Sequence, residues 1–151
     1  MTKERGFTLV EVLIVVVIMA VLAAVVVPQF GASTEDAKQS TGEFNVSTLR
    51  SIIQTYRGQH NGLSPTLTAG ALPGLTAKTL ANGTVDTSGP YGPYLLDFPE
   101  NPFTGNTVVA ATTKTNATIA DTDVTSAGAG GWLYNAANGE IFLDSDPGYA
   151  F

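Results

Sequence analysis

The sequence contains no cysteine in its 151 residues. This absence excludes a disulfide framework, a thiolate nucleophile and a metal site built on cysteine ligands. Charged residues are also scarce, at 13% of the chain, and 13 acids against 7 bases give a net charge of −6. A partner held through its phosphates needs clustered lysine and arginine. We therefore expect no nucleic-acid partner.

Histidine is nearly absent too, because His60 is the only one in the sequence. A zinc site would lack enough histidine ligands. A hydrolytic triad on His60 would need an activated serine and a carboxylate brought beside it. Since His60 lies next to the Asn61-Gly62 turn signal, a surface position is the simpler expectation. We predict that the chain is not an enzyme and has no catalytic residues.

The most prominent feature that is present is an unbroken apolar run of 16 residues, Val12 to Val27. Counted from Phe7, the apolar segment covers 21 residues. At about 1.5 Å per residue this is roughly 31 Å of helix, enough to cross a hydrocarbon core of about 30 Å. Lys3 and Arg5 precede the segment, so the positive-inside rule places the N-terminus in the cytoplasm and the rest of the chain outside.

Glu11 interrupts the apolar segment and needs an explanation. A cleaved secretory signal, with a small-residue region at Ala20 to Ala24, or a plain signal anchor accounts for the basic start and the apolar core. Neither interpretation gives Glu11 a function. A carboxylate inside an apolar span costs about 2.5–3.5 kcal/mol on insertion scales, so an acid kept there is expected to be functional.

The start of the chain, MTKERGFTLVEVLIVVVIMAVLAAVVVPQF, resembles the type IV pilin-like family, which includes the type II secretion pseudopilins. The matching residues after the basic leader are Gly6, Phe7, Thr8, Leu9, Glu11 and Pro28. The resemblance implies that a prepilin peptidase cleaves after Gly6 and that the new amine of Phe7 is methylated. Residues 1–6 are then a cleaved prepilin leader, residues 7–30 a transmembrane and assembly helix, and residues 31–151 a periplasmic helix end with a small head.

The same resemblance implies that Glu11 acts in assembly. In the family this glutamate pairs with the terminal amine of a neighbouring subunit, which here is the amine of Phe7. Glu11 lies four residues after Phe7, about 6 Å along the same helix face. Two charges that are each costly in lipid offset one another when the subunits are staggered. We therefore expect Glu11 to set the register between subunits.

The helix is expected to continue beyond the apolar segment. Pro28 cannot donate to the carbonyl four residues before it, which predicts a kink there. An amphipathic pattern then resumes, with a predicted buried face made of Phe44, Leu49, Ile52, Ile53 and Tyr56. These features predict one long helix from about Phe7 to about Arg57, bent near Pro28.

The strongest strand signals lie near the end of the chain. Two β-favouring runs, Trp132 to Asn135 and Glu140 to Leu143, flank a connection that ends in Asn138-Gly139, which predicts a hairpin. Two strands alone are marginal, and Val108-Val109 is the candidate for a third. The expected fold class is α+β with a type IV pilin-like fold, in which the long bent helix packs on a small antiparallel sheet.

Further segments resemble the secretion-type major pseudopilins, the G-type members of the family. These are Tyr56 to Pro65 at the helix end, Gly92-Pro-Tyr-Leu95, and Pro99-Glu-Asn-Pro102. Surface pilins commonly close a C-terminal loop with a disulfide, which this chain cannot form. We therefore favour a type II secretion pseudopilus subunit over a type IV pilus pilin. The alternative from another class is a signal-anchored periplasmic binding protein or enzyme.

The resemblance implies a set of partners and a location. The partners are copies of the chain itself, minor pseudopilins or pilins, prepilin peptidase, the lipid bilayer, and a membrane assembly platform with a cytoplasmic ATPase. The expected location is the bacterial inner membrane, with a single pass, a cytoplasmic N-terminus and a periplasmic head. After assembly the subunit would stand in a periplasmic filament that drives protein export.

Two further groups of residues have competing interpretations. Asp121 with Asp123, and Asp144 with Asp146, are spaced as calcium ligands can be, and secretion-type major pseudopilins bind calcium near their C-terminal strands. We favour solvated turns at these acids and expect no cofactor, with calcium as the candidate to test at Asp144 and Asp146. A group of aromatic residues is expected to form the core of the head rather than a carbohydrate platform. Its members are Tyr91, Tyr94, Phe98, Phe103, Trp132 and Tyr134.

Overall fold

The computed structural model describes residues 6–119 and 130–145, and within this part it leaves out the side chains of residues 27–32. The chain divides into two compact units, Met1–Ala37 and Lys38–Phe151. Each unit is described by itself below, and the second is called the head.

One helix, α1 (Leu9–Gln59), runs without interruption through both units. It ends where Asn61 and Gly62 take positive φ angles of 53° and 83°, and the amide of Gly62 donates to the carbonyl of Arg57. The predicted long helix is thus confirmed, with its end two residues later than expected. The helix assignment includes Pro28, whose side chain lies outside the description, so the bend there stays a prediction.

The part of α1 in the head buries one face with a regular spacing of four and three residues. The buried positions are Gly42, Val46, Leu49, Ile53 and Tyr56, and the spacing continues to His60, one residue beyond the end of α1. This spacing keeps one stripe of the helix turned toward the core. Phe44 does not belong to the stripe, contrary to the prediction, and is 69% exposed. It lies two residues from both Gly42 and Val46, which turns it about 200° around the helix and away from the core.

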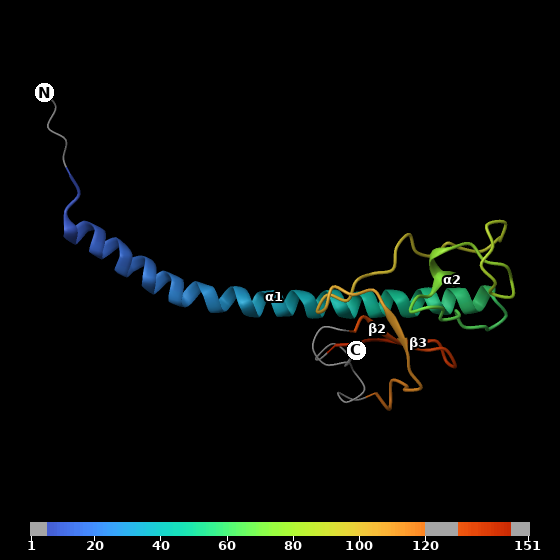
Figure 1. The fold of residues 1–151 in the computed structure, drawn as a ribbon. Helices are drawn as coiled ribbons and strands as arrows, with labels where there is room; N and C mark the ends of the chain where they lie inside the picture. The colour runs from blue at the N-terminus through green and yellow to red at the C-terminus, as the bar shows by residue number, and fades with distance from the viewer. Residues whose placement is uncertain (1–5, 120–129, 146–151) are drawn as a thin grey trace, which may run out of the picture. The chain divides into compact units, whose positions relative to one another are not determined.

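The head contains a three-stranded sheet in the order β1 (Val109–Ala111), β2 (Trp132–Asn135) and β3 (Glu140–Leu143). Figure 1 shows β2 and β3 alongside α1. Strands β2 and β3 form the predicted antiparallel hairpin, with Trp132 opposite Leu143 and Asn135 opposite Glu140. Strand β1 pairs with β2 in parallel, so the sheet is mixed rather than purely antiparallel. A long connection between the two strands permits this direction, because the chain can return before it forms β2.

The segment between α1 and β1 closes the other side of the core. A short helix, α2 (Pro73–Thr76), begins at Pro73 and buries Leu75, while Leu72 just before it is also buried. Proline therefore starts a helix here instead of breaking one, because the first helical position needs no amide donor. Isolated bridges from Thr79 to Val85 and to Tyr91 hold the following loop. The core thus lies between α1, this segment and the sheet.

Candidate functional site

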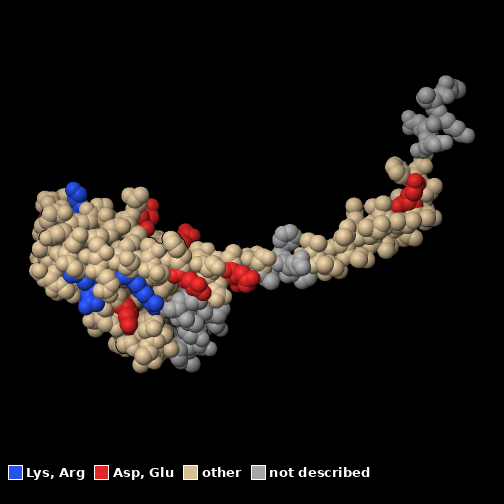
Figure 2. Space-filling view, turned by 180° about the vertical axis from the view of Figure 1, so that it is seen from behind, with Lys and Arg blue, Asp and Glu red and all other residues tan. Residues whose placement is uncertain are grey.

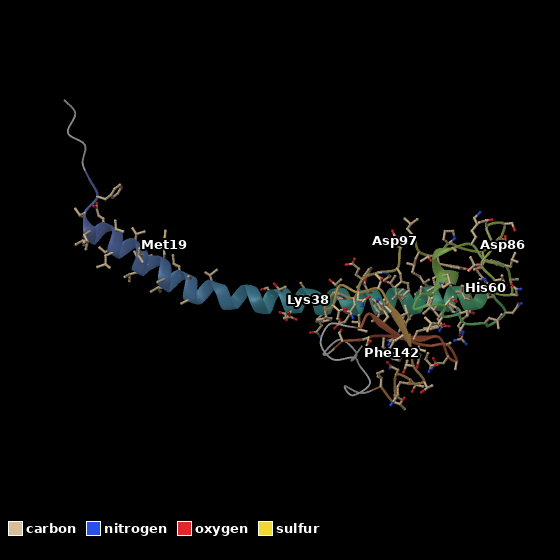
Figure 3. All side chains as sticks on the ribbon, in the orientation of Figure 1. Met19, Lys38, His60, Asp86, Asp97 and Phe142 are labelled. Carbon is tan, nitrogen blue, oxygen red and sulfur yellow. The ribbon has the colours of Figure 1, made fainter. Side chains whose placement is uncertain are left out.

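The first unit presents an apolar helical surface that nothing else in the described chain covers. The stretch Leu9–Val26 is long and apolar enough to cross a membrane, and none of it is buried within the chain. Figure 3 shows its side chains pointing outward around the helix, with Met19 labelled among them. Met19 is 63% exposed. Such a surface is unfavourable in water and requires lipid or other apolar helices around it.

The first turn of α1 holds Glu11 in a reciprocal arrangement with Thr8. The amide and the hydroxyl of Thr8 each donate to Oε2 of Glu11 at 2.8 Å, and the amide of Glu11 donates back to the Thr8 hydroxyl at 3.3 Å. Thr8 is the N-cap residue and Glu11 lies three residues later, so the pair forms a capping box. Sequence reasoning identified Glu11 but missed this partner, although Thr-x-x-Glu before an apolar run is a signal for it.

The predicted processing residues lie just before this turn. Gly6 and Phe7 are exposed and non-helical, and Phe7 is 87% exposed. The ring of Phe7 and the first turns of the helix line a groove of about 580 Å³, completed by Glu11, Val12, Ile14, Val15 and Val16. Glu11 is the one charged residue in that lining. Figure 2 likewise shows an acidic side chain near the N-terminal end of the described helix, which is followed by the uncharged residues 12–26.

This geometry brings together Gly6, Phe7 and Glu11, the residues that the sequence singled out. The predicted cleavage position after Gly6 lies before the start of the helix, so cleavage there would not require a helix to unwind. The carboxylate is held at the end of the helix by neutral donors, in a groove walled by apolar side chains. Glu11 is exposed in the single chain, so a cation brought into this groove would reach its carboxylate, and the charge attraction would exceed that in water where lipid or neighbouring apolar helices enclose the groove.

Two arginines tie α1 to the hairpin of the head. Arg57 Nη1 donates to the carbonyl of Asn138 at 2.6 Å, and Arg50 Nε donates to the carbonyl of Ile141 at 3.3 Å. The guanidinium of Arg50 also lies 5.5 Å from the ring centre of Phe142. Burial lowers the pKa of Arg50 below its ordinary value, against a smaller opposing effect of Glu140. The hairpin is therefore fixed to the helix by polar as well as apolar contacts.

His60 is fully buried, so the expectation of a surface position is wrong. Its Nδ1 lies 2.8 Å from the carbonyl of Tyr56 and its Nε2 lies 2.8 Å from the hydroxyl of Thr79. The carbonyl can only accept, so Nδ1 carries the proton in the neutral ring and Nε2 accepts from Thr79. The imidazole also stacks on the ring of Tyr56 at 3.8 Å between centres. His60 thus joins α1 to the following loop, as shown by its place in Figure 3.

Five of the six aromatic residues form part of the core, as predicted, while Tyr91 is partly buried with its ring centre 5.1 Å from that of His60. Trp132 and Tyr134 are buried, and Tyr94, Phe98 and Phe103 are partly buried against the core. The hydroxyl of Tyr134 donates to the carbonyl of Pro65 at 3.0 Å. Burial raises the pKa of Tyr134 to about 12, against smaller opposing effects of Ser64 and Arg57. Because these rings face the interior, they do not make an open platform for a carbohydrate.

The candidate calcium ligands are only partly within the description. Asp144 is 2% exposed, and its amide donates to the carbonyl of Gly131 at 3.1 Å. Asp121, Asp123 and Asp146 lie outside the described residues. Within residues 6–119 and 130–145, no three histidine, aspartate or glutamate side chains gather in a way that would hold a metal ion. Because Asp144 is buried, the favoured interpretation as a solvated turn is wrong for this residue, and calcium binding at Asp144 and Asp146 stays an untested alternative.

Comparison with known proteins places the N-terminal geometry in context. A family model described as the prokaryotic N-terminal methylation motif matches residues 1–27. The chain is 31% identical to type II secretion system core protein G of Klebsiella pneumoniae over 103 residues, which are 68% of this chain and 71% of that protein. It is 32% identical to the protein of the same name from Escherichia coli K12 over 83 residues, 50% of this chain and 57% of that one.

Other relatives align over shorter stretches. Core protein G of Pectobacterium carotovorum subsp. carotovorum is 36% identical over 59 residues, which are 39% of this chain and 38% of that protein. The aligned part of the chain therefore spans 38% of the Pectobacterium protein's length, 57% of the Escherichia coli protein's length and 71% of the Klebsiella pneumoniae protein's length. No solved structure matches the chain.

Proposed function

The chain belongs to the family of type II secretion system core protein G, and on that premise we propose that it is the major structural subunit of a periplasmic pseudopilus. It acts through polymerisation and not through catalysis. The observation that carries the proposal is the bare apolar helix Leu9–Val26 with Glu11 held at its first turn, directly after the exposed Gly6-Phe7 junction.

Processing comes first in the proposed sequence of events. Prepilin peptidase cleaves after Gly6, the leader of residues 1–6 is lost, and the amine of Phe7 is methylated. The new amine is a cation one helical turn from Glu11. In a single subunit the carboxylate accepts from Thr8. In the filament it also meets the amine of a neighbouring subunit, and this pairing sets the stagger between the two helices.

Assembly then exchanges lipid for protein around the apolar helix. Burial of each large apolar side chain is worth about 1.5–3 kcal/mol relative to water. Both the bilayer and the filament provide that burial, so the net gain on extraction is much smaller than the sum. For this reason the subunit needs a membrane assembly platform and a cytoplasmic ATPase as partners, together with minor pseudopilins. The subunit starts in the inner membrane, with its N-terminus in the cytoplasm and its head in the periplasm.

Two other functions are less well supported. A type IV pilus pilin would share the N-terminal helix, but the relatives named above are secretion proteins. A signal-anchored enzyme or binding protein would use Glu11 only as a helix cap, which a neutral residue could also provide, and the single histidine is occupied in the core of the head. Calcium is not needed for any step proposed here.

The mature N-terminus tests the proposed function directly. The chain is purified from membranes of its native host, or of a host that carries a prepilin peptidase, and its mass is measured. An N-methylated Phe7 at the start of the chain is the expected result. A start near Val25 would indicate an ordinary secretory signal, and an intact Met1 would indicate a plain signal anchor. Either result would overturn the proposal.

A further inference from the structure

Phe44 is a large apolar side chain of the head that has no part in its core. It is 69% exposed on α1 and lies 17 residues beyond Val27, the last residue of the apolar run. The residues one turn before and after it are small and polar, namely Ser40, Thr41, Ser47 and Thr48. The ring therefore stands clear of the helix surface, and lipid around the apolar span does not account for it. An exposed aromatic side chain flanked by small residues is suited to insertion into a partner.

The head also has a surface pocket on the loop that follows α2. Its volume is about 450 Å³, and its wall is made largely of the apolar groups of Thr76, Ala77, Val85, Thr87 and Pro93, with Lys78 and Asp86 beside them. The amide of Asp86 donates to the carbonyl of Lys78 at 2.9 Å, which fixes the two sides of the pocket. The Asp86 carboxylate accepts from the amide and the hydroxyl of Ser88. A single aromatic ring occupies only part of such a volume.

Glu43 is exposed next to Phe44 on α1, and Lys78 is exposed at the pocket. Asp86 also lines the pocket, but its carboxylate accepts from Ser88, which leaves Lys78 as the group of opposite charge that Glu43 can face. We propose that the ring of Phe44 of one copy inserts into the Ala77–Val85–Pro93 pocket of a neighbouring copy, with Glu43 of the first copy facing Lys78 of the second. The contact rests on the proposed function, because it is a contact between heads within the filament.

The partner is a second copy because one chain presents both halves of the contact at separate places. Figure 3 shows Lys38 and Asp86 toward opposite ends of the head, and Phe44 follows Lys38 by less than two helical turns. A chain therefore does not fill its own pocket. A contact between two different patches is heterologous, and it adds copies head to tail into an open filament when its rotation does not close a ring.

Disulfide cross-linking tests this contact, since the chain has no cysteine of its own. Ser47→Cys places a thiol one turn from Phe44, and Thr87→Cys places one in the pocket wall; both positions are exposed. Oxidation of assembled filaments of the double variant should give a ladder of dimers, trimers and longer products. Each single variant should give none.

Three outcomes would overturn the inference. Dimers from Ser47→Cys alone would mean that Phe44 meets Phe44 in an isologous contact. A cross-linked monomer from the double variant would mean that the chain covers its own pocket. No cross-link in filaments that form normally would mean that the two patches do not meet.

A second set of variants asks whether the contact matters for assembly. Phe44→Ser should lower the amount of filament at least tenfold, while Leu96→Ser should leave it unchanged. Leu96 is the matched control, because it is another large apolar side chain of the head and is 92% exposed.

A charge swap tests the proposed ion pair. Glu43→Lys should weaken assembly, and Lys78→Glu in the same chain should restore it. Equal filament yields from Phe44→Ser and the parent chain would contradict the inference and leave the proposed function intact. An absence of filaments from the parent chain would instead contradict the proposed function.

Discussion

Glu11 makes different contacts in the single chain from those proposed for the filament. In the single chain it completes a capping box with Thr8, which satisfies the first amides of α1. A cap of this kind is worth about 0.5–2 kcal/mol. That amount is small for a helix that the membrane itself stabilises, so removal of the carboxylate should spare insertion. The expected loss is in the pairing between subunits.

Glu11→Ala should therefore insert into the membrane and be processed at Gly6 normally, yet fail to assemble. Membrane fractionation and the mass of the mature chain measure the first two steps, and sheared filament yield measures the third. Glu11→Gln keeps acceptors for Thr8 but removes the charge, and it should behave as Glu11→Ala does in assembly. Normal filaments from Glu11→Gln would show that the negative charge is not what sets the register.

The buried hydroxyl of Tyr134 predicts that the folding stability of the head falls at alkaline pH. Burial raises its pKa to about 12 from an ordinary value near 10. A raised pKa means that the folded state holds the proton more tightly, so the stability is fully present below about pH 10 and is lost as the pH rises toward about 12. At about 1.4 kcal/mol for each pKa unit, the loss attributable to this group is about 2–3 kcal/mol.

The test is urea unfolding of the full chain in detergent at about pH 9 and about pH 11.5, followed by the fluorescence of Trp132. The parent chain should lose more stability between the two values than Tyr134→Phe does. At about pH 9 the variant should be slightly less stable, because the carbonyl of Pro65 loses its donor. The same alkaline loss in both chains would show that Tyr134 is not responsible.

At the scale of elements, the buried stripe of α1 holds the head together. Ile53 is fully buried in the middle of that stripe. It packs closely under the hairpin turn, because a Cβ atom added to Gly139 would lie only 3.0 Å from Cγ2 of Ile53. Truncation to alanine removes apolar contacts and leaves a cavity, which costs about 2–5 kcal/mol.

Ile53→Ala should therefore lower the free energy of unfolding by that amount, measured by urea unfolding in detergent. Ser51→Ala is the control, since Ser51 is exposed on the same helix two residues earlier and should change stability by less than about 0.5 kcal/mol. Because the apolar segment is untouched, Ile53→Ala should still insert into the membrane. A stability equal to that of the parent chain would mean that the stripe is not the main support of the head.

The elements that could be predicted from the sequence are those with a strong local signal. Helix α1 follows from a long apolar run and a 3.6-residue period, and the hairpin follows from two β-favouring runs around Asn138-Gly139. The parallel direction of β1 depends on how a 20-residue connection returns, which local propensity does not determine. His60 is buried because its spacing continues the stripe, at steps of four, three and four from Leu49 through Ile53 and Tyr56, and this spacing outweighs the turn signal of its neighbours. The same spacing excludes Phe44 from the core.

At the scale of the whole molecule, the two units differ in the surroundings they require. Met19 in the first unit is 63% exposed, and Ser88 in the head is exposed as well. In a water-soluble protein a cysteine at either position would react equally well with a maleimide. In the proposed membrane-anchored subunit, lipid covers position 19 and the periplasm surrounds position 88.

Single-cysteine variants of this cysteine-free chain distinguish these two states. Cells with a permeabilised outer membrane are treated with a membrane-impermeant maleimide, and labelling is compared with that after denaturation. Ser88→Cys should be labelled in intact inner membranes and Met19→Cys should be protected, with both labelled fully once denatured. Thr2→Cys in the leader of a Gly6→Ala variant, designed to block cleavage, should also be protected, because the leader lies in the cytoplasm. Labelling of Thr2→Cys with protection of Ser88→Cys would reverse the proposed orientation, and labelling of Met19→Cys would mean that the apolar helix is not in the membrane.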